Sequence, residues 1–352
     1  MFDLLSKIQK SVRFRLNYNW YSWRNPQLLN TVYLSVISKD PIVILTVCNN
    51  WENYNQIAKQ LGQNPVYFFV MPEWTREGKF ADWDVEQQAR AKVSFPNLNF
   101  VTLCSSSREV EILNSKGLQA VLCGHNAFLD PALFKPLGLE KRWDAVCDAQ
   151  IAPYKCNHLA RRIKSLVLVS APAPKEHYNA DYILRIKRDL AHAFWSNVNT
   201  TGNYRFLNAE EINTIYNQSK VGLILSGEEG GCYAAIQYLL AGLPVVSTKN
   251  IGGRDSFADP SYWTTVDPDE CAVEQAAAKF ISDPPNPQMV RQKTIEKMME
   301  HRSHFEDEVN RILQSHGKAV RNADAWEKIY LNKMRPPTAL WQIPKLLTEF
   351  RY

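Results

Sequence analysis

Residues 227–253 read GEEGGCYAAIQYLLAGLPVVSTKNIGG, and this stretch decides the fold that the sequence predicts. It opens with a glycine-rich loop, continues as an apolar helix over residues 233–241, and turns at a glycine into a β-branched strand over residues 244–248. A second glycine pair, Gly252 and Gly253, follows that strand. The pattern predicts a helix packed between two parallel strands, as in an open α/β sheet.

The residues before this stretch add another helix and strand. Asn208 and Glu211 form the pattern of a capping box, which predicts a helix over residues 210–218, and an apolar strand over 221–226 follows it. Both glycine-rich turns are therefore expected at the carboxyl ends of parallel strands, which is the edge where α/β proteins bind ligands.

The first glycine-rich turn has the features of an anion site. Gly230 and Gly231 let a ligand approach the backbone because they carry no Cβ, and the helix that follows directs its positive N-terminal end toward the turn. Spacing alone thus predicts an anionic, nucleotide-like ligand. The alternative is that these glycines only form tight turns.

Strands and helices alternate over most of the chain. Apolar runs predict strands over residues 41–48, 66–71, 100–103 and 120–123, and then over 144–147, 165–170, 221–226, 244–248 and 262–266. Helical patterns lie between these runs, for example over 51–61 and 108–116. Nearly continuous apolar strands are typical of parallel sheets covered on both faces. The sequence therefore predicts an α/β protein of two doubly wound domains, the first one small, with a boundary near residues 138–142.

The composition agrees with two globular domains. The 352 residues are 45% hydrophobic and 22% charged, which excludes collagen-like and wholly disordered proteins. No apolar run approaches the length of about 18 residues that a membrane-spanning helix needs. The seven cysteines contain no C-x-x-C pair and are expected to be reduced, which favours a cytoplasmic protein. The net charge of +5 is too small to indicate a nucleic-acid partner.

Residues 1–25 differ from the rest of the chain. They carry five basic residues and one acid, and apolar residues recur every four positions at Leu4, Ile8, Val12 and Leu16. A helix with this pattern, followed by aromatic residues, suits the surface of an anionic membrane. The alternatives are a terminal helix that docks on its own protein and, on this segment alone, a nucleic-acid contact.

Separated stretches of the chain resemble the donor site of retaining glycosyltransferases with the GT-B fold, in particular the family 4 or group 1 type. Residues 229 and 237 lie at the family's two acidic positions, which have seven residues between them; residues 242–246 match its G-x-P-V-V strand, and residues 252–253 its Gly-Gly turn. Residues 150–155, QIAPYK, resemble its Arg-Leu-x-Pro-x-Lys pattern, and residues 124–136 resemble its interdomain crossing.

The resemblance implies two Rossmann-like domains that face a central cleft. Residues 26–140 would form the acceptor-side domain, residues 141–325 the domain that binds a nucleotide sugar, and residues 326–352 a C-terminal helix and tail. The implied reaction moves a sugar, as in a hexosyltransferase, from a nucleotide diphosphate to a glycan, lipid-linked or protein acceptor with retention of configuration. The family uses no metal and no other cofactor for this transfer.

The resemblance also assigns roles to individual residues. Lys155 is expected at the diphosphate and Glu229 at the transferred sugar, and both are predicted to be catalytic, since preorganised charge stabilises a developing leaving group and an oxocarbenium-like centre. The predicted donor-binding residues are Gln150, Asn208, Ser226, Glu228, Gly230, Gly231, Cys232, Tyr233, Gln237, Gly253 and Arg254. On the acceptor side the candidates are Asn49, Asn50 and His125, and a structural role is the alternative for that histidine.

Two donor-site positions depart from the family pattern. Gln237 replaces the glutamate that holds the nucleotide ribose, and Gln150 replaces an arginine on the diphosphate. Glutamine accepts a hydrogen bond but carries no charge, whereas the arginine would be a bidentate cation. Arg254 is the candidate to supply the missing charge. The alternative reading is a weak or inactive GT-B protein that binds a nucleotide sugar or a partner.

Other patterns carry less chemistry. His301 and His304 lie three positions apart on a predicted helix over 290–314, and their acidic neighbours favour a solvated face rather than a metal site. A second helix is predicted over 324–330. The sequence contains no G-x-S-x-G, G-x-G-x-x-G or G-x-x-x-x-G-K-[ST] motif, which argues against α/β-hydrolases, dinucleotide enzymes and P-loop NTPases.

Overall fold

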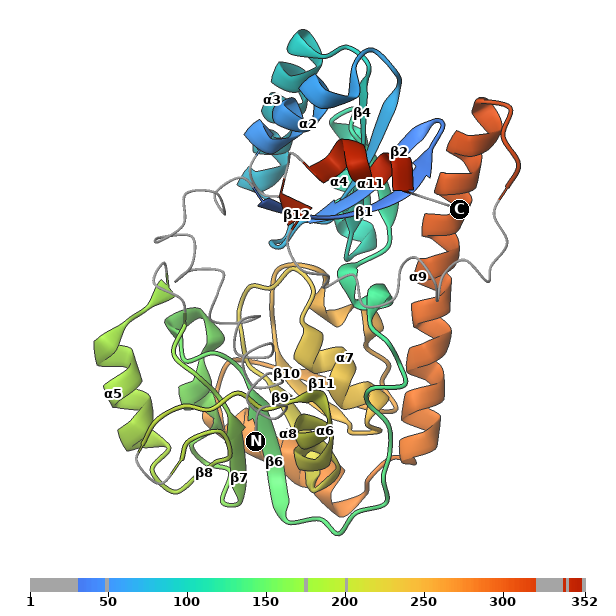
Figure 1. The fold of residues 1–352 in the computed structure, drawn as a ribbon. Coiled ribbons are helices and arrows are strands. Elements are labelled where there is room, and N and C mark those ends of the chain that lie inside the picture. Colours follow the sequence, from blue (N-terminus) through green and yellow to red (C-terminus); the bar gives the residue numbers. More distant parts are fainter. Residues whose placement is uncertain are drawn as a thin grey trace, which may run out of the picture. The chain divides into compact units, whose positions relative to one another are not determined.

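The computed structural model describes residues 31–47, 51–173, 177–199, 202–320, 338–339 and 342–349 (Figure 1). The chain divides into two compact units, one formed by Met1–Leu129 with Met298–Tyr352 and the other by Asp130–Lys297. The units differ from the predicted domains, because the first boundary lies earlier and the C-terminal part of the chain returns to unit 1. The segment 1–25 and the helix predicted over 324–330 lie outside the described residues.

Unit 1 is built on a sheet of six strands in the order β12-β1-β2-β3-β4-β5 (Figure 1). The strands are β1 (Thr31–Lys39), β2 (Ile42–Val47), β3 (Val66–Val70), β4 (Leu98–Cys104), β5 (Gln119–Leu122) and β12 (Thr338–Ala339). Strands β2 to β5 are parallel and confirm the four predicted runs, whereas β1 pairs antiparallel with both β2 and β12. The sequence prediction missed β1 because its residues, TVYLSVISK, mix apolar and polar side chains.

Helices cover both faces of this first sheet. They are α2 (Trp51–Leu61), α3 (Lys79–Ser94), α4 (Ser107–Ser115), the 3-10 helix η2 (His125–Phe128), the later part of α9 (Pro287–Ser315) and α11 (Ile343–Glu349). Alternate residues of β2 enter different clusters: Ile42 and Ile44 pack with α2 and α11, while Val43 and Leu45 pack with η2 and α9. This alternation follows from the two-residue period of a strand and gives unit 1 a core on each face.

Unit 2 is built on a sheet whose six strands are all parallel, in the order β11-β10-β9-β6-β7-β8. The strands are β6 (Trp143–Asp148), β7 (Leu166–Val169), β8 (Phe194–Trp195), β9 (Ser219–Ile224), β10 (Val245–Thr248) and β11 (Trp263–Val266). The five predicted strands of the second array are confirmed, and only the two-residue edge strand β8 was missed. Both units therefore have the Rossmann-like α/β character that the sequence predicted.

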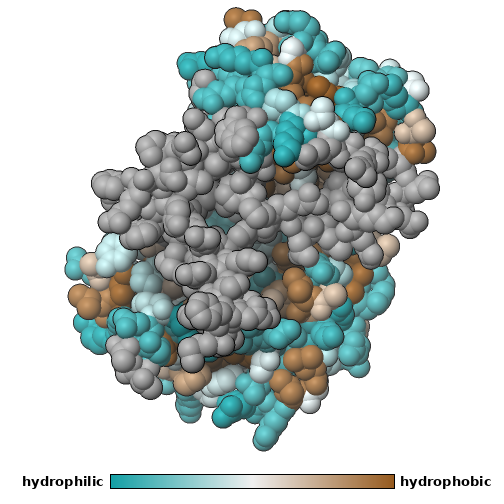
Figure 2. Space-filling view, viewed as in Figure 1, coloured by the Kyte–Doolittle hydropathy of each residue, from teal (hydrophilic) through white to brown (hydrophobic). Residues whose placement is uncertain are grey.

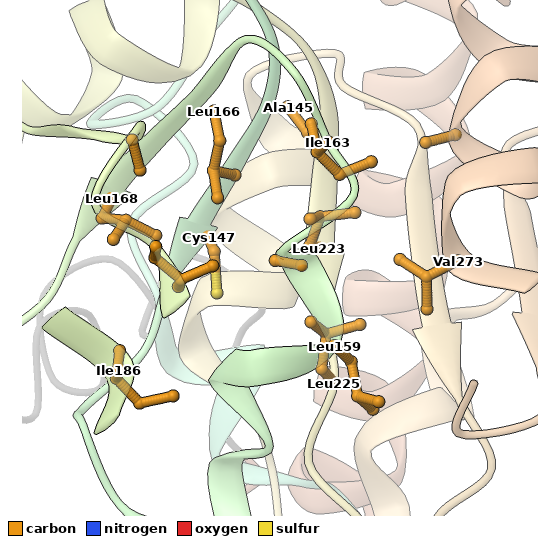
Figure 3. Close-up of a cluster of buried hydrophobic side chains, with 14 of the residues drawn as sticks. Ala145, Cys147, Leu159, Ile163, Leu166, Leu168, Ile186, Leu223, Leu225 and Val273 are labelled. Carbon is orange, nitrogen blue, oxygen red and sulfur yellow. The ribbon is translucent and has the colours of Figure 1, made fainter. Parts of the chain in front are cut away.

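The helices of unit 2 also lie on both faces of its sheet. They are α5 (Ala180–Asp189), α6 (Ala209–Asn217), α7 (Tyr233–Leu240), α8 (Glu270–Ser282) and the 3-10 helices η3 (Pro153–Lys155), η4 (Asn157–Ala160) and η6 (Gly253–Phe257). Figure 3 shows one core, in which side chains from β6, β7 and β9 meet those of the helices; Cys147, Leu168, Leu223, Ile186 and Val273 belong to it. The capping box predicted for α6 is present, since Asn208 accepts from Glu211 N and Glu211 accepts from Asn208 N.

Two glycines permit close packing in unit 2. A Cβ on Gly222 of β9 would lie 2.3 Å from the Tyr238 ring of α7, so this helix can approach the sheet only because position 222 has no side chain. Gly242 ends α7 with φ +82°, and a Cβ there would lie 2.6 Å from Cβ of Pro287 at the start of α9.

The face drawn in Figure 2 is mixed in polarity. On the face drawn in Figure 2, hydrophilic and apolar side chains of the described residues lie interspersed. Within this described part of the chain, no helix combines the length and the apolar character that crossing a membrane requires.

Candidate functional site

Three loops meet at the carboxyl edge of the unit 2 sheet. They follow β6, β9 and β10, and backbone hydrogen bonds join them: Gly227 N donates to Tyr154 O at 3.4 Å, Ile251 N to Gly227 O at 3.0 Å, and Glu229 N to Ile251 O at 3.1 Å. The parallel ladder thus continues beyond the strands as a bridge between Glu228 and Ile251. Because the loops are joined in this way, the glycine-rich turn is fixed relative to its neighbours.

This edge contains the topological switch point of unit 2. Strand β6 pairs with β7 on one side and with β9 on the other, so the chain leaves β6 in one direction and later returns on its opposite side. Open α/β sheets bind ligands in the crevice at such a point, outside the carboxyl ends of the two strands. The loops after β6 and β9 carry Lys155 and Glu229, the two residues predicted to be catalytic.

Lys155 and Glu229 form an ion pair at this point, between Nζ and Oε1. Their side chains are only 16% and 11% exposed, and Lys155 Nζ also lies 5.1 Å from the centre of the Tyr154 ring. Burial is the largest single influence and opposes the charge on Lys155, but the charge and hydrogen bond of Glu229, together with Cys232 and Tyr154, raise the pKa of the lysine overall. Lys155 is therefore a protonated cation at neutral pH, and the site holds one fixed charge of each sign.

The glycine-rich turn continues directly into α7. Glu228 is exposed, Gly230 is buried, and Gly231 is partly exposed. Cys232 is the N-cap of the helix and Tyr233 its first residue. Burial and the nearby carboxylate raise the pKa of Cys232 to about 11, so its thiol stays neutral. The N-terminal end of α7, which favours anions, thus lies beside the Lys155–Glu229 pair.

The remaining polar candidates take up different positions. Gln150 is exposed after β6, and its Oε1 accepts from the Tyr154 hydroxyl at 3.4 Å. Ser226 is buried, and its Oγ makes no hydrogen bond within the described part of the chain. Asn208 caps α6, so its side-chain oxygen is already used by the backbone of that helix.

Arg254 does not lie as the sequence led us to expect. Its side chain is 0% exposed, and its guanidinium donates five hydrogen bonds: two to Asp255 and one each to the carbonyl oxygens of Ile224, Ser226 and Thr248. A guanidinium has five N–H groups, so none is left for a phosphate. Arg254 thus links the turn after β10, which includes Gly253, to the ends of β9 and β10 by hydrogen bonds. The expectation that Arg254 supplies charge to the diphosphate is therefore wrong.

A chain of polar side chains that sequence reasoning missed lies beside the site. The Tyr216 hydroxyl of α6 donates to Asp148 Oδ2 at 2.6 Å and lies 3.3 Å from Gln237 Oε1 of α7. The Tyr238 hydroxyl accepts from Asp148 N at 2.6 Å. The only hint of this chain in the sequence was Asp148, an aspartate at the end of an apolar strand. Tyr216 and Tyr238 gave no hint, because an aromatic residue within an apolar helix pattern is expected to belong to the core.

The acceptor-side candidates belong to unit 1. His125 lies in η2 and is 8% exposed, whereas Asn49 and Asn50 fall outside the described residues. The expectation of a solvated face at His301 and His304 is wrong. His301 is buried and accepts from Gly124 N at 3.4 Å, and His304 contacts a backbone carbonyl of β5 at 3.1 Å. Both rings face η2 and β5 because this part of α9 packs on the first sheet.

Metal ligands do not gather in the described ranges. Among those residues, no three His, Cys, Asp or Glu side chains lie close enough together to hold a metal ion.

Comparisons with known proteins identify the fold. No protein-family model matches this sequence, and no curated protein matches it. Among solved structures, HepE from Anabaena in complex with UDP aligns over 77% of this chain and 78% of its own, at 12% identity and a TM-score of 0.51. Sucrose-phosphate synthase from Thermosynechococcus elongatus aligns over 74% and 69%, at 15% identity and a TM-score of 0.52.

A third solved structure, the UDP-forming α,α-trehalose-phosphate synthase from Burkholderia xenovorans in complex with glucose-6-phosphate, aligns over 74% of this chain and 72% of its own. Its identity is 12% and its TM-score 0.52. Similarity at these identities establishes the fold, and the fold is that of GT-B glycosyltransferases, as the sequence motifs predicted.

Proposed function

We propose that this protein is a retaining glycosyltransferase that moves a hexose from a nucleoside diphosphate sugar to a glycan, lipid-linked or protein acceptor. The observation that carries the proposal is the Lys155–Glu229 ion pair, which lies at the switch point of the unit 2 sheet in a chain with the GT-B fold. The sequence motif requires these two residue types, and the folded chain brings them together from different loops.

Lys155 would bind the diphosphate. In the structure its ammonium group faces Glu229, and a bound diphosphate would offer further anionic oxygens to the same cation. As the glycosidic bond breaks, negative charge grows on the leaving phosphate, and a cation already in place stabilises that charge without reorganisation. The N-terminal end of α7 would act in the same sense, so the proposed mechanism requires no metal ion.

Glu229 would act at the sugar. Its carboxylate is mostly buried beside the glycine-rich turn, where the backbone at Gly230 and Gly231 leaves room for a ring to approach. Glycosyl transfer passes through an oxocarbenium-like state, and a carboxylate close to the anomeric carbon stabilises that positive charge. The neighbouring residue Glu228 is exposed, so its carboxylate is solvated and less suited than that of Glu229 to act on a bound sugar.

The test is turnover with a matched control. UDP-, GDP- and ADP-hexoses are incubated with the wild type, and release of the nucleoside diphosphate is followed by a coupled assay. Glu229→Gln should lower release by at least about 100-fold, a size typical of losing one preorganised electrostatic group. Asp144→Asn is the control, because Asp144 pairs with Lys220 at the opposite end of β6 and β9. Equal loss in both variants, or none in Glu229→Gln, would place the site elsewhere.

A second candidate function is binding without turnover. Gln150 and Gln237 are neutral at positions where the family carries charge, and Gln150 is exposed after β6, where its contact with the Tyr154 hydroxyl is a long one of 3.4 Å. A protein of this kind would bind a nucleotide sugar stoichiometrically but release no nucleoside diphosphate with any acceptor. Calorimetry beside the release assay separates the two functions.

We also infer from the sequence that residues 1–25 hold a cytoplasmic protein at an anionic membrane surface. The segment is basic and its apolar residues repeat at helical spacing. The full chain should co-sediment with vesicles that contain phosphatidylglycerol, and deletion of residues 1–25 should abolish this. Equal sedimentation of the two proteins would refute the membrane contact.

A further inference from the structure

A pocket in unit 1 lies between α3 and the first residues of β4 and β5. Its volume is about 370 Å³, within the range of small-molecule sites. Asn99, which lines it, is the second residue of β4, and Gln119, which also lines it, is the first residue of β5. The pocket therefore lies at the amino ends of these parallel strands, opposite to the carboxyl edge at which α/β proteins carry out their chemistry.

The inner face of α3 explains why space remains here. The buried residues of this helix recur every three or four positions and are small or polar: Ala81, Asp84, Gln88 and Ala91. None of these four is a long apolar side chain that could fill the gap between helix and sheet. Gln88 and Phe100, which are 4% and 3% exposed, form the floor of the pocket, and the exposed Lys92 lies at its rim.

Gln88 carries a buried donor that the protein does not use. Its Nε2 atom is enclosed and makes no hydrogen bond within the described part of the chain. A buried polar group without a partner lowers stability, whereas an apolar side chain of the same length would pack at this position without that loss. Packing therefore does not account for an amide at position 88. An acceptor supplied by a ligand in the pocket does.

The other polar residues of the pocket restrict what such a ligand can be. Asn99 Nδ2 donates to Asn97 O at 3.2 Å and to Val66 O at 3.5 Å, and Gln119 Nε2 donates to Glu308 Oε1. Each of these two amides thus keeps its carbonyl oxygen, an acceptor, for a ligand.

Lys92 adds the only charge among the described residues that line the pocket. Its ammonium group forms no ion pair within the described ranges, and no carboxylate lines the pocket there. The lining therefore presents two donors, Lys92 and Gln88, of which one is a cation, and two acceptors, Asn99 and Gln119.

A ligand that satisfies all four groups needs both an acid group and hydroxyls. A bare inorganic anion accepts from Lys92 and Gln88 but has no proton for the two carbonyl oxygens. A neutral polyol donates to those oxygens but leaves the cation without a partner. A sugar ring with a carboxylate or phosphate substituent does both, and its C–H groups can lie against the apolar side chains of Val85 and Leu118.

We propose that this pocket is a binding site for an acidic sugar unit. Lys92 and Gln88 donate to its acid group and ring oxygens, and Asn99 and Gln119 accept from its hydroxyls. This inference does not depend on the proposed function, because the pocket belongs to unit 1 and the candidate donor site to unit 2.

The first experiment measures binding to the full-length protein without any nucleotide sugar. Glucuronate, glucose 6-phosphate, glucose and inorganic phosphate are titrated by calorimetry and by saturation-transfer NMR. At least one of the two acidic sugars should bind about fivefold or more tightly than glucose and than inorganic phosphate, since only the acidic sugars use all four groups. Tight binding of one acidic sugar alone identifies the acid group as carboxylate or phosphate.

Two variants place this binding in the pocket. Gln88→Met should weaken the acidic sugar by about tenfold, the size expected for one buried hydrogen bond, and Gln87→Met on the next position of α3 is the matched control. Lys92→Met should reduce the affinity for the acidic sugar to that for glucose, whereas Lys79→Met at the other end of α3 should change little. Glu229→Gln should bind the acidic sugar as the wild type does.

The second experiment measures stability and separates a ligand contact from a structural role. Because Gln88 Nε2 has no hydrogen bond within the described residues, Gln88→Met should raise the melting temperature of the ligand-free protein by about 2–4 °C. Gln87→Met should leave it within about 1 °C of the wild-type value. A lower melting temperature in Gln88→Met would show that the amide stabilises the fold and would refute its role in binding.

The remaining outcomes also decide. If neither acidic sugar binds, if inorganic phosphate binds equally well, or if Gln88→Met and Gln87→Met bind the sugar alike, the proposed site is wrong. None of these results bears on the donor site, which the release assay with Glu229→Gln tests separately.

Discussion

Lys155 and Glu229 lie 74 residues apart in the sequence and form an ion pair across the carboxyl ends of β6 and β9. The same two strands carry a second pair at their amino ends, between Lys220 and Asp144. The first pair is 16% and 11% exposed, and the second is 36% and 30% exposed. Because charges act more strongly where water is excluded, the first pair has the stronger field and the larger cost if one partner is lost.

Replacement of Lys155 should abolish most diphosphate affinity. Lys155→Met removes a cation and leaves Glu229 to repel phosphate, so we expect nucleoside diphosphates to bind about 10- to 100-fold more weakly, as for one charge-assisted hydrogen bond of ~1.5–3 kcal/mol. Calorimetry measures the change. Lys220→Met removes the pair at the amino ends and should alter affinity by less than about twofold. Equal effects of the two variants would mean that neither lysine contacts the ligand.

Arg254 should matter for stability rather than for affinity. Arg254→Met removes the hydrogen bonds that the guanidinium donates to three backbone carbonyls and to Asp255, whose carboxylate then keeps, among the described residues, only its bond from Asn250. This loss should reduce the free energy of unfolding of unit 2 by about 3 kcal/mol or more. Urea denaturation measures this loss. The affinity of the fraction that remains folded should change little. A stable variant with strongly weakened diphosphate binding would restore the role that the sequence suggested.

Gly222 should tolerate no side chain. An alanine Cβ at this position would lie 2.3 Å from the buried Tyr238 ring, so Gly222→Ala should destabilise unit 2 by about 1–3 kcal/mol through overpacking. Gly227→Ala is the matched control, because a Cβ there meets no atom within 4 Å. In denaturant titrations, the free energies of unfolding of the two variants should differ by this same amount of about 1–3 kcal/mol.

Asp259 should make stability depend on acid pH. Hydrogen bonds from Ser261, and then the charge of Lys293, lower the pKa of Asp259 from 3.8 to about 2. A depressed carboxyl pKa adds stability above about pH 4, and this contribution is lost as the pH falls toward 2. The stability difference between wild type and Asp259→Asn should therefore shrink from pH 6 to pH 3. Ser261→Ala removes the hydroxyl, which is the largest cause, and should flatten this dependence. An unchanged slope would show that the backbone N–H of residue 261 and Lys293 are sufficient to lower the pKa.

Most strands could be predicted because each buried strand corresponds to a single run of apolar residues in the sequence. Residues 66–71 and 221–226 are mainly apolar runs, and both became strands with parallel neighbours on each side. Strand β1 was missed because its apolar residues are interrupted by Ser35 and Ser38, and β12 because two residues give no pattern. The pairing of β12 with β1 joins segments about 300 residues apart, and a local reading contains no information on such a contact.

In the candidate site, too, some residues could be recognised from local sequence and others only from the fold. Lys155 and Glu229 could be proposed as a pair because their motifs are short and ordered along the chain, and the structure brings their side chains into contact. The role of Arg254 could not, since a cation beside a glycine turn looks the same whether its N–H groups face a ligand or backbone carbonyls. Tyr216 was hidden for a related reason: its apolar ring reads as core, and only the fold shows that its hydroxyl meets Asp148.

The discontinuous make-up of unit 1 has a consequence for the order of events during translation. Phe305, Val309 and Ile312 of α9 complete the core cluster that contains Val43 and Leu45. The ribosome releases them only after all of Asp130–Lys297. Unit 2 can therefore fold while the chain is still growing, whereas β2 to β4 keep an uncovered apolar face until α9 emerges. The strands of unit 1 are made before unit 2, but their core is completed after it.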